Sequence, residues 1–309
     1  MTNEPSAPAP STEAVERPRH RLPAAVRAMR PRQWIKNVLV FAAPLTAGKL
    51  FQVDVLVAAA LAFVAFSMIS ATVYLINDIR DVAEDRLHPR KRFRPIAAGE
   101  LKVPAAWVLA AITAVVGFGL GFFVDIQLGV TLAIYLALQI LYSMFLKHQP
   151  IIDLAMVASG FLLRAIAGGA ATGLYLSPWF LLVATFGSMF MVAGKRYSEM
   201  VNLGAEGGTR KSLSRYSISY LQFAWQLSAA VALVSYCLWA FEQQDRGPLG
   251  VPWTVLSIAP LTIGLLQYAM EVDRGDAGEP EDVVLKHRAL QVIGLLWLVM
   301  VAIAVFVPA

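Results

Sequence analysis

The sequence predicts an all-α protein that spans a membrane nine times. Of its 309 residues 58% are hydrophobic and 15% are charged, and the mean hydropathy is +0.60. The apolar residues also gather in runs of about 20, the length that an α-helix needs to cross a bilayer. The nine expected spans cover approximately residues 34–52, 55–78, 103–123, 127–147, 151–172, 178–200, 217–241, 251–270 and 289–307.

The first expected span is the least regular, because it contains Lys36, Pro44 and Lys49. These residues indicate a tilted or partly interfacial segment. Residues 1 to about 20 are rich in Pro, Ala, Ser and Glu and have no apolar run, so they resemble neither a signal peptide nor a packed element. We therefore expect a disordered cytoplasmic tail over residues 1–26 and a single transmembrane domain over residues 27–309.

The distribution of Lys and Arg predicts the orientation, because cytoplasmic loops carry the excess of positive charge. With a cytoplasmic N-terminus, 23 of the 26 Lys and Arg residues lie on the cytoplasmic side. Lys49 and Arg246 then lie outside, and Arg164 lies within a span. The net charge of +5 thus reports topology in a membrane protein, and we expect no nucleic-acid partner.

Histidine and cysteine chemistry is not supported by the sequence. The single cysteine, Cys237, excludes an intrachain disulfide and a cysteine-based metal site. The four histidines fall at expected helix ends or loops and show no metal-binding spacing. A metal site, if present, is therefore expected to use oxygen ligands.

Such ligands gather at the end of the second span, in Y-L-I-N-D-I-R-D-V-A-E-D at 74–85. If the helix continues, Asn77 or Asp78, Asp81 and Asp85 repeat every three to four residues and share one face. Carboxylate oxygens are ligands that Mg²⁺ prefers, together with water and substrate phosphates. A solvated, charged helix end is the alternative, but four acids within eight residues favour the metal site.

A basic loop follows, H-P-R-K-R-F-R-P at 88–95, in which two prolines indicate irregular structure. Its positively charged residues help to set the orientation of the protein in the membrane. Beside a Mg²⁺ site they also suit a substrate with several phosphates, because Arg binds phosphate oxygens in bidentate pairs. The candidate phosphate-binding side chains in this region are Arg86, Lys91, Arg92 and Arg94.

The pattern N-D-x-x-D-x-x-x-D at 77–85, with K-R-x-R-P-I-A-A-G at 91–99, resembles the first aspartate-rich motif and loop of the UbiA superfamily of intramembrane prenyltransferases. The resemblance covers almost the whole chain from about Arg30. It implies nine helices around a central cavity and a diphosphate bound through Mg²⁺. Mn²⁺ is an alternative ion, because the choice between the two rests on availability more than on ligand type. The candidate metal ligands are Asn77, Asp78, Asp81 and Asp85.

The sixth span departs from the general superfamily pattern. It presents G-K-R-Y-S-E at 194–199 where a second aspartate-rich motif is usual. Together with R-P-R-Q-W-I-K-N at 30–37 and the stretch at 153–169, this resembles a branch that transfers phosphoribosyl groups. That resemblance implies 5-phosphoribosyl 1-diphosphate as donor and decaprenyl phosphate, or another polyprenyl phosphate, as acceptor. It further implies synthesis of the arabinose precursor of cell-wall arabinan, at the cytoplasmic face of a bacterial inner membrane.

The residues are consistent with this chemistry. A phosphate monoester has a second pKa of about 6, so the acceptor is largely a dianion at neutral pH and needs no general base. Departure of diphosphate leaves an oxocarbenium-like centre, as in glycoside cleavage, and a bound metal ion neutralises the leaving group. Asp78, Asp81 and Lys195 are the candidate catalytic residues, and in-line displacement predicts a β-linked product.

Arg164 lies inside the fifth span, where an arginine costs about 2.5–3.5 kcal/mol on insertion scales. It serves either a structural ion pair or a phosphate. Asp153 lies eleven residues away on the same helix, about 16 Å, which argues against direct pairing. The other candidate substrate-binding residues are Asn77, Lys36, Tyr142, Lys147, Arg196, Tyr197 and Glu199.

Two other functions fit parts of the pattern. A conventional prenyltransferase with an aromatic acceptor keeps the first motif but leaves Lys195 and Arg196 unexplained. A transporter for polyprenyl phosphates fits a polar cavity, but it predicts broken helices and an internal repeat, and the sequence shows no convincing repeat. Membrane lipids are expected partners, and the sequence leaves open both the prenyl chain length and whether the chain forms a homo-oligomer.

Overall fold

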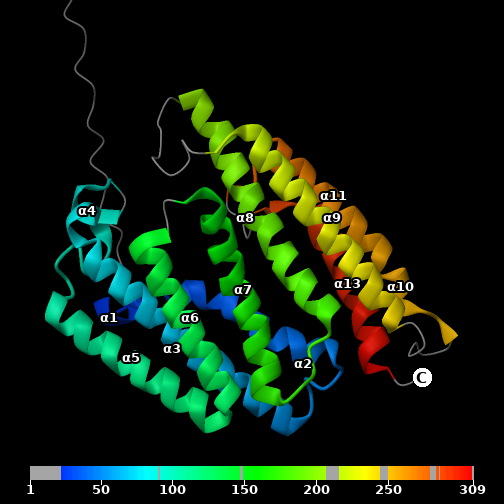
Figure 1. Cartoon of the computed structure of the whole chain (residues 1–309), viewed down its shortest axis with the longest axis horizontal. Helices are drawn as coiled ribbons and strands as arrows, with labels where there is room; N and C mark the ends of the chain where they lie inside the picture. Colours follow the sequence, from blue (N-terminus) through cyan, green and yellow to red (C-terminus); the bar gives the residue numbers. More distant parts are fainter. Residues whose placement is uncertain are drawn as a thin grey trace, which may run out of the picture.

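A computed structural model describes residues 22–89, 91–146, 149–206, 216–243, 250–278, 283–284 and 286–307. Over these ranges the regular structure is entirely helical (Figure 1). Residues 1–21 of the expected tail lie outside the description. Residues 24–26, which the sequence analysis assigns to the tail, belong instead to α1 (Ala24–Ala28), whose Ala28 is fully buried against α3.

Eight helices in the described part of the chain are long and apolar enough to cross a membrane. They confirm the eight expected spans from 55–78 onward. Their bounds are α3 (Val53–Arg80), α5 (Val103–Val124), α6 (Ile126–Leu141) continued by the π-helical turn η3 (Tyr142–Leu146), α7 (Pro150–Thr172), α8 (Pro178–Glu206), α9 (Ile218–Glu242), α11 (Ile258–Asp273) preceded by α10 (Trp253–Leu256), and α13 (Arg288–Phe306).

The first expected span takes a different form. It consists of a 3-10 helix, η1 (Pro31–Phe41), and a short α-helix, α2 (Ala42–Thr46). At about 2.0 Å per residue in η1 and 1.5 Å in α2, the two helices reach about 30 Å, which matches the hydrocarbon thickness. Arg30 contacts Asp78 at one end, and Gly48 lies against Val305 at the other. A ninth crossing through this segment stays a prediction.

Close backbone packing holds η1 in place. A Cβ atom added to Gly168 of α7 would lie 2.0 Å from the carbonyl oxygen of Val40, so only glycine permits this approach. Val40 itself is fully buried in a core that also includes Phe66 of α3 and Leu163 of α7. The 3-10 geometry of η1 thus goes with tight packing against α7, which the hydropathy of the segment does not encode.

Helix α7 joins the two halves of the bundle. Leu154 belongs to a core shared with α8, α9, α11 and α13, whereas Leu163 belongs to the core shared with η1, α3 and α6. Figure 1 shows α3, α5 and α6 on one side of α7, and α8, α9, α11 and α13 on the other. The central cavity that the resemblance implies stays a prediction.

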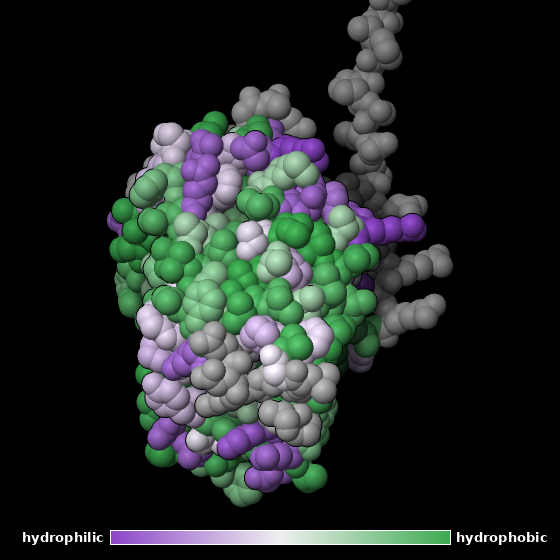
Figure 2. Space-filling model, turned by 90° about the vertical axis from the view of Figure 1, so that its right-hand side faces the viewer, coloured by the Kyte–Doolittle hydropathy of each residue, from purple (hydrophilic) through white to green (hydrophobic). Residues whose placement is uncertain are grey.

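The surface has the polarity of a membrane protein. Figure 2 shows a broad hydrophobic zone with hydrophilic residues gathered toward the two ends. Large apolar side chains such as Val292, Leu295 and Phe223 are more than half exposed. With the eight apolar helices, this surface identifies a multi-pass membrane protein.

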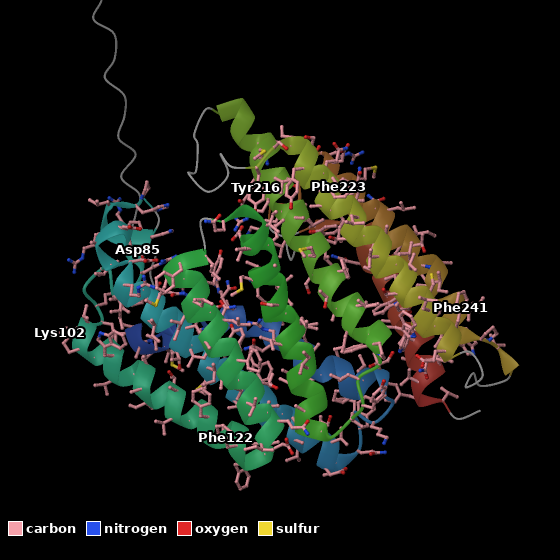
Figure 3. The ribbon with its side chains drawn as sticks, viewed as in Figure 1. Asp85, Lys102, Phe122, Tyr216, Phe223 and Phe241 are labelled. Atoms are coloured by element: carbon pink, nitrogen blue, oxygen red, sulfur yellow. The ribbon has the colours of Figure 1, made fainter. Side chains whose placement is uncertain are left out.

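The polar residues of interest gather at one end of the bundle. Asp85 and Tyr216 both lie at this end in Figure 3, on opposite sides of the upper part of α7. Helix α4 (Val82–Leu87) and the 3-10 turn η2 (Lys91–Phe93) follow α3 here. This end therefore contains the acidic stretch and the basic loop that the sequence analysis singled out.

Candidate active site

Two buried carboxylates converge at the acidic end of α3. The side chains of Asp78 and Asp85 are 3% and 2% exposed. A single nitrogen of Arg94, Nη1, donates to both, at 3.1 Å from Asp78 Oδ1 and 2.7 Å from Asp85 Oδ2. Because an unpaired carboxylate is costly to bury, Arg94 provides the charge that lets the two acids lie together.

A second arginine reaches the same site from the start of η1. Arg30 Nη2 donates to Asp78 Oδ1 at 2.5 Å, and its guanidinium carbon lies 4.8 Å from the ring centre of Tyr74. Arg30 has a φ of 54°, in the left-handed region that non-glycine residues seldom adopt. The sequence analysis did not include Arg30 among the site residues, although its place in R-P-R-Q-W-I-K-N was an available signal.

Asn77 and Asp81 lie at the same helix end but do not join this pair. Helix α3 ends at Arg80 and α4 begins at Val82, so the helix is interrupted at Asp81. Neither side chain forms a hydrogen bond or ion pair with another described residue. The part of the chain that the structure describes contains no group of three or more His, Cys, Asp and Glu placed to hold one metal ion. The expected alignment of three carboxylates on one face is therefore not found.

The carboxylate pair nevertheless fits a divalent cation. Oxygen atoms of Asp78 and Asp85 already share one positively charged partner, the Nη1 of Arg94. Carboxylate oxygens are the usual Mg²⁺ ligands, and such sites are commonly completed by water and substrate phosphates. Two buried carboxylates, with Asn77 and Asp81 close by in sequence, are a donor set of this kind.

A second charged cluster joins α6, α7 and α8. Arg196 Nε and Nη2 contact Asp153 at 3.2 and 3.5 Å, and Arg196 Nη1 contacts Glu199 at 3.2 Å. The hydroxyl of Tyr142 donates to Asp153 Oδ1 at 2.5 Å. Arg196, which is expected to bind substrate, thus has two acidic partners within the protein. Beside this cluster, burial raises the pKa of Tyr216, which lies just before α9, and the Asp153 carboxylate contributes to the increase.

Lys195 differs from its neighbour Arg196. It is half-buried and forms no hydrogen bond or ion pair with other residues in the described ranges. The next residue but one, Tyr197, donates to Asp273 at 3.4 Å, and Ser198 donates to the carbonyl of Val272 at 3.2 Å. These contacts fasten α8 to the end of α11, so Lys195 is presented from a fixed part of the helix.

The remaining predicted cations have varied surroundings. Arg86 Nε donates to the carbonyl of Ala97 at 3.2 Å, and the guanidinium carbon of Arg92 lies 4.9 Å from the ring centre of Phe93. Lys91 and Lys36 are half-buried. The prediction for Lys147 falls outside the described residues.

Arg164 lies in a polar network inside the bundle. Its Nε donates to Asn37 Oδ1 at 2.8 Å, Nη1 to the carbonyl of Gly160 at 2.6 Å, and Nη2 to the hydroxyl of Tyr135 at 3.3 Å. Asn37 in turn donates to Ser67 at 2.9 Å. Arg164 is 5% exposed. Its partners in the described part of the chain are neutral, and its expected phosphate-binding role stays a prediction.

The helical architecture and the charged site at one end of an apolar bundle define the class of protein, a multi-pass helical membrane protein with a buried polar site. The chain belongs to the UbiA prenyltransferase family, which matches residues 38–290.

Curated relatives match almost the whole chain. It is 44% identical to the decaprenyl-phosphate phosphoribosyltransferase of Corynebacterium glutamicum, over 96% of this chain and 93% of the relative. It is 46% identical to the protein of the same name from Mycobacterium tuberculosis, over 96% and 99%. For the protein of that name from Mycolicibacterium smegmatis the identity is 45%, over 94% of each chain.

Solved structures share the fold. A UbiA homolog from Archaeoglobus fulgidus bound to DMAPP and Mg²⁺ superposes with a TM-score of 0.65 at 17% identity, over 92% of this chain and 99% of that one. The same homolog bound to Cd²⁺ gives a TM-score of 0.62 at 18% identity, with the same coverage. At these identities the likeness shows the fold alone, and it confirms the UbiA-like architecture expected from the sequence.

Proposed function

We propose that this protein transfers the 5-phosphoribosyl group from 5-phosphoribosyl 1-diphosphate to decaprenyl phosphate, with release of diphosphate. The observation that carries the proposal is the 44–46% identity, over nearly the full chain, to relatives named for phosphoribosyl transfer to decaprenyl phosphate. The product would serve as a precursor of cell-wall arabinan.

The donor diphosphate would bind at the acidic end of α3. Asp78 and Asp85 would hold Mg²⁺, or Mn²⁺ in its place, and Asn77 and Asp81 are available as further ligands. The metal ion supplies charge neutralisation of the leaving diphosphate. Arg30 and Arg94, which already contact the carboxylates, lie where phosphate oxygens would come close to the metal site.

The second end of the donor, the 5-phosphate, needs a separate cation. Lys195 meets this need best, because it has no partner among the described residues whereas Arg196 is held by Asp153 and Glu199. Arg86, Lys91 and Arg92 would provide further positive charge beside the first motif, and Lys36 would add one from within η1. Tyr142, Tyr197 and Glu199 support this region of α8 through their contacts, and we assign them to its architecture.

The acceptor requires little chemistry from the protein. Its phosphate is largely a dianion at neutral pH, so attack at C1 of ribose needs no general base and inverts that centre. The polyprenyl chain would lie among the apolar helices, with the reacting phosphate at the charged end. The distribution of Lys and Arg supports a cytoplasmic position for this end, and the resemblance to bacterial phosphoribosyltransferases supports a location in the inner membrane.

The test is direct. The purified protein is incubated with Mg²⁺, labelled 5-phosphoribosyl 1-diphosphate and decaprenyl phosphate, and label is followed into the lipid phase with and without chelator. Chelator-sensitive transfer is the expected result. Absence of transfer, together with activity on a prenyl diphosphate and an aromatic acid, would overturn the proposal and identify a conventional prenyltransferase.

A further inference from the structure

We propose that Arg94 occupies the divalent-cation position between Asp78 and Asp85 until a phosphorylated donor binds, so that the site takes a metal ion only together with phosphate. Arg94 is thereby a specificity-determining residue. The proposal rests on the proposed function, since it concerns the metal and donor of the same site.

The geometry places Arg94 where a shared metal ion would be. One nitrogen, Nη1, contacts a carboxylate oxygen of each acid, at 3.1 and 2.7 Å. A cation that bridges both carboxylates must lie near that nitrogen, so Arg94 and the metal ion compete for the same oxygens. Arg30 adds a contact of 2.5 Å to the oxygen of Asp78 that Arg94 also uses.

The charges favour joint entry of metal and phosphate. Asp78 and Asp85 carry two negative charges, and Arg30 and Arg94 carry two positive charges, so the four-residue cluster is neutral. A divalent ion that entered alone would lie beside two arginines and would be repelled by them. The repulsion is strong because the carboxylates are only 2–3% exposed, and charges interact strongly where water is excluded. A diphosphate removes this repulsion, because it accepts hydrogen bonds from guanidinium groups displaced from the acids.

The exchange needs only a side-chain movement. The backbone around Arg94 is held by hydrogen bonds from Arg94 N to the Lys91 carbonyl, 2.9 Å, and from Ala98 N to the Arg94 carbonyl, 2.8 Å. Ile96, two residues further, is 1% exposed and packs in a core with α1, α3 and α5. The Arg94 side chain, by contrast, is 28% exposed, so its guanidinium can turn from the buried carboxylates toward a bound phosphate.

The experiment measures Mn²⁺ binding to the purified full chain by electron paramagnetic resonance, with and without inorganic diphosphate, correcting for the Mn²⁺–diphosphate complex in buffer. For the unaltered protein we expect weak binding of Mn²⁺ alone and at least about tenfold tighter binding with diphosphate. Arg94→Gln is expected to tighten binding of Mn²⁺ alone by about tenfold and to reduce the effect of diphosphate. Lys102→Gln is the matched control, since it removes an exposed charge just before α5, shortly after the same loop, and Lys102 forms no hydrogen bond or ion pair with Asp78 or Asp85.

Two results would overturn the proposal. One is Mn²⁺ binding to Arg94→Gln that is no tighter than to the Lys102→Gln control. The other is binding to the unaltered protein that diphosphate does not improve, a measurement that stands even if Arg94→Gln fails to fold. Failure of the proposed function is distinguishable, because it would appear as absent phosphoribosyl transfer while these Mn²⁺ affinities still follow the expected pattern.

Discussion

Arg196 on α8 binds Asp153 at the start of α7 through two guanidinium nitrogens, at 3.2 and 3.5 Å. Asp153 is 4% exposed and also accepts a hydrogen bond from Tyr142. The pair therefore connects three helices at the end of the bundle that holds the candidate site. A direct contact between Arg196 and a phosphate would have to compete with this carboxylate. We therefore assign Arg196 mainly a structural role.

The Arg196–Asp153 pair is expected to stabilise the bundle. Arg196→Met and Asp153→Asn should each lower the thermal unfolding temperature, because the first leaves the buried Asp153 carboxylate without its cation and the second leaves Arg196 with Glu199 as its remaining acidic partner. In a double-mutant cycle the coupling free energy should be about 0.5–3 kcal/mol. Unfolding is measured in detergent by monitoring the loss of the helical signal. Strictly additive effects of the two substitutions would contradict the pairing.

Asp78 is expected to be essential for transfer. Asp78→Asn keeps the shape of the side chain but removes the charge, and should lower the rate at least about 100-fold, since a metal ion contributes several kcal/mol of charge stabilisation. The rate of label transfer into lipid provides the measurement, with the unfolding temperature as a check on folding. Glu84→Gln is the control, because Glu84 is exposed on α4 and should be replaced with little effect. Comparable rates for both variants would remove Asp78 from the site.

Lys195 is expected to act on the donor. Lys195→Ala should raise the KM for 5-phosphoribosyl 1-diphosphate about tenfold or more, since a hydrogen bond to a charged group contributes about 1.5–3 kcal/mol, and leave the KM for decaprenyl phosphate nearly unchanged. Steady-state kinetics with each substrate varied in turn separates the two effects. Lys195→Arg should recover part of the donor affinity. Equal changes in both KM values would place Lys195 at the acceptor or in the structure.

Gly168 is expected to tolerate no side chain. A Cβ there would lie 2.0 Å from the Val40 carbonyl oxygen, so Gly168→Ala must push η1 away from α7 and should cost about 1–3 kcal/mol. The unfolding temperature of the variant measures this cost. Gly119→Ala on α5 is the matched control, because no atom lies within 4 Å of its added Cβ, and it should be neutral or slightly stabilising. An equal response at both positions would contradict the tight packing.

Helices that face lipid could be predicted from the sequence because their constraint is local. A run of about 20 apolar residues satisfies its own backbone hydrogen bonds in a bilayer, whatever its neighbours are. Eight spans were predicted correctly on this ground. The segment at 34–52 was the exception, because much of it forms a 3-10 helix. That helix packs closely against Gly168, a residue far away in the sequence.

The sequence by itself determined the membrane fold class, the concentration of acids at 78–85 and the basic loop that follows, because composition and local spacing are sufficient for these. The tertiary structure alone decided that Arg94 joins Asp78 to Asp85, that Arg196 meets Asp153, and that Arg164 meets Asn37. Each of these contacts depends on how separate helices pack and on which side chain that packing brings within contact distance of its partner. Several partners were electrostatically equivalent in the sequence, and only the packing of the bundle distinguishes them.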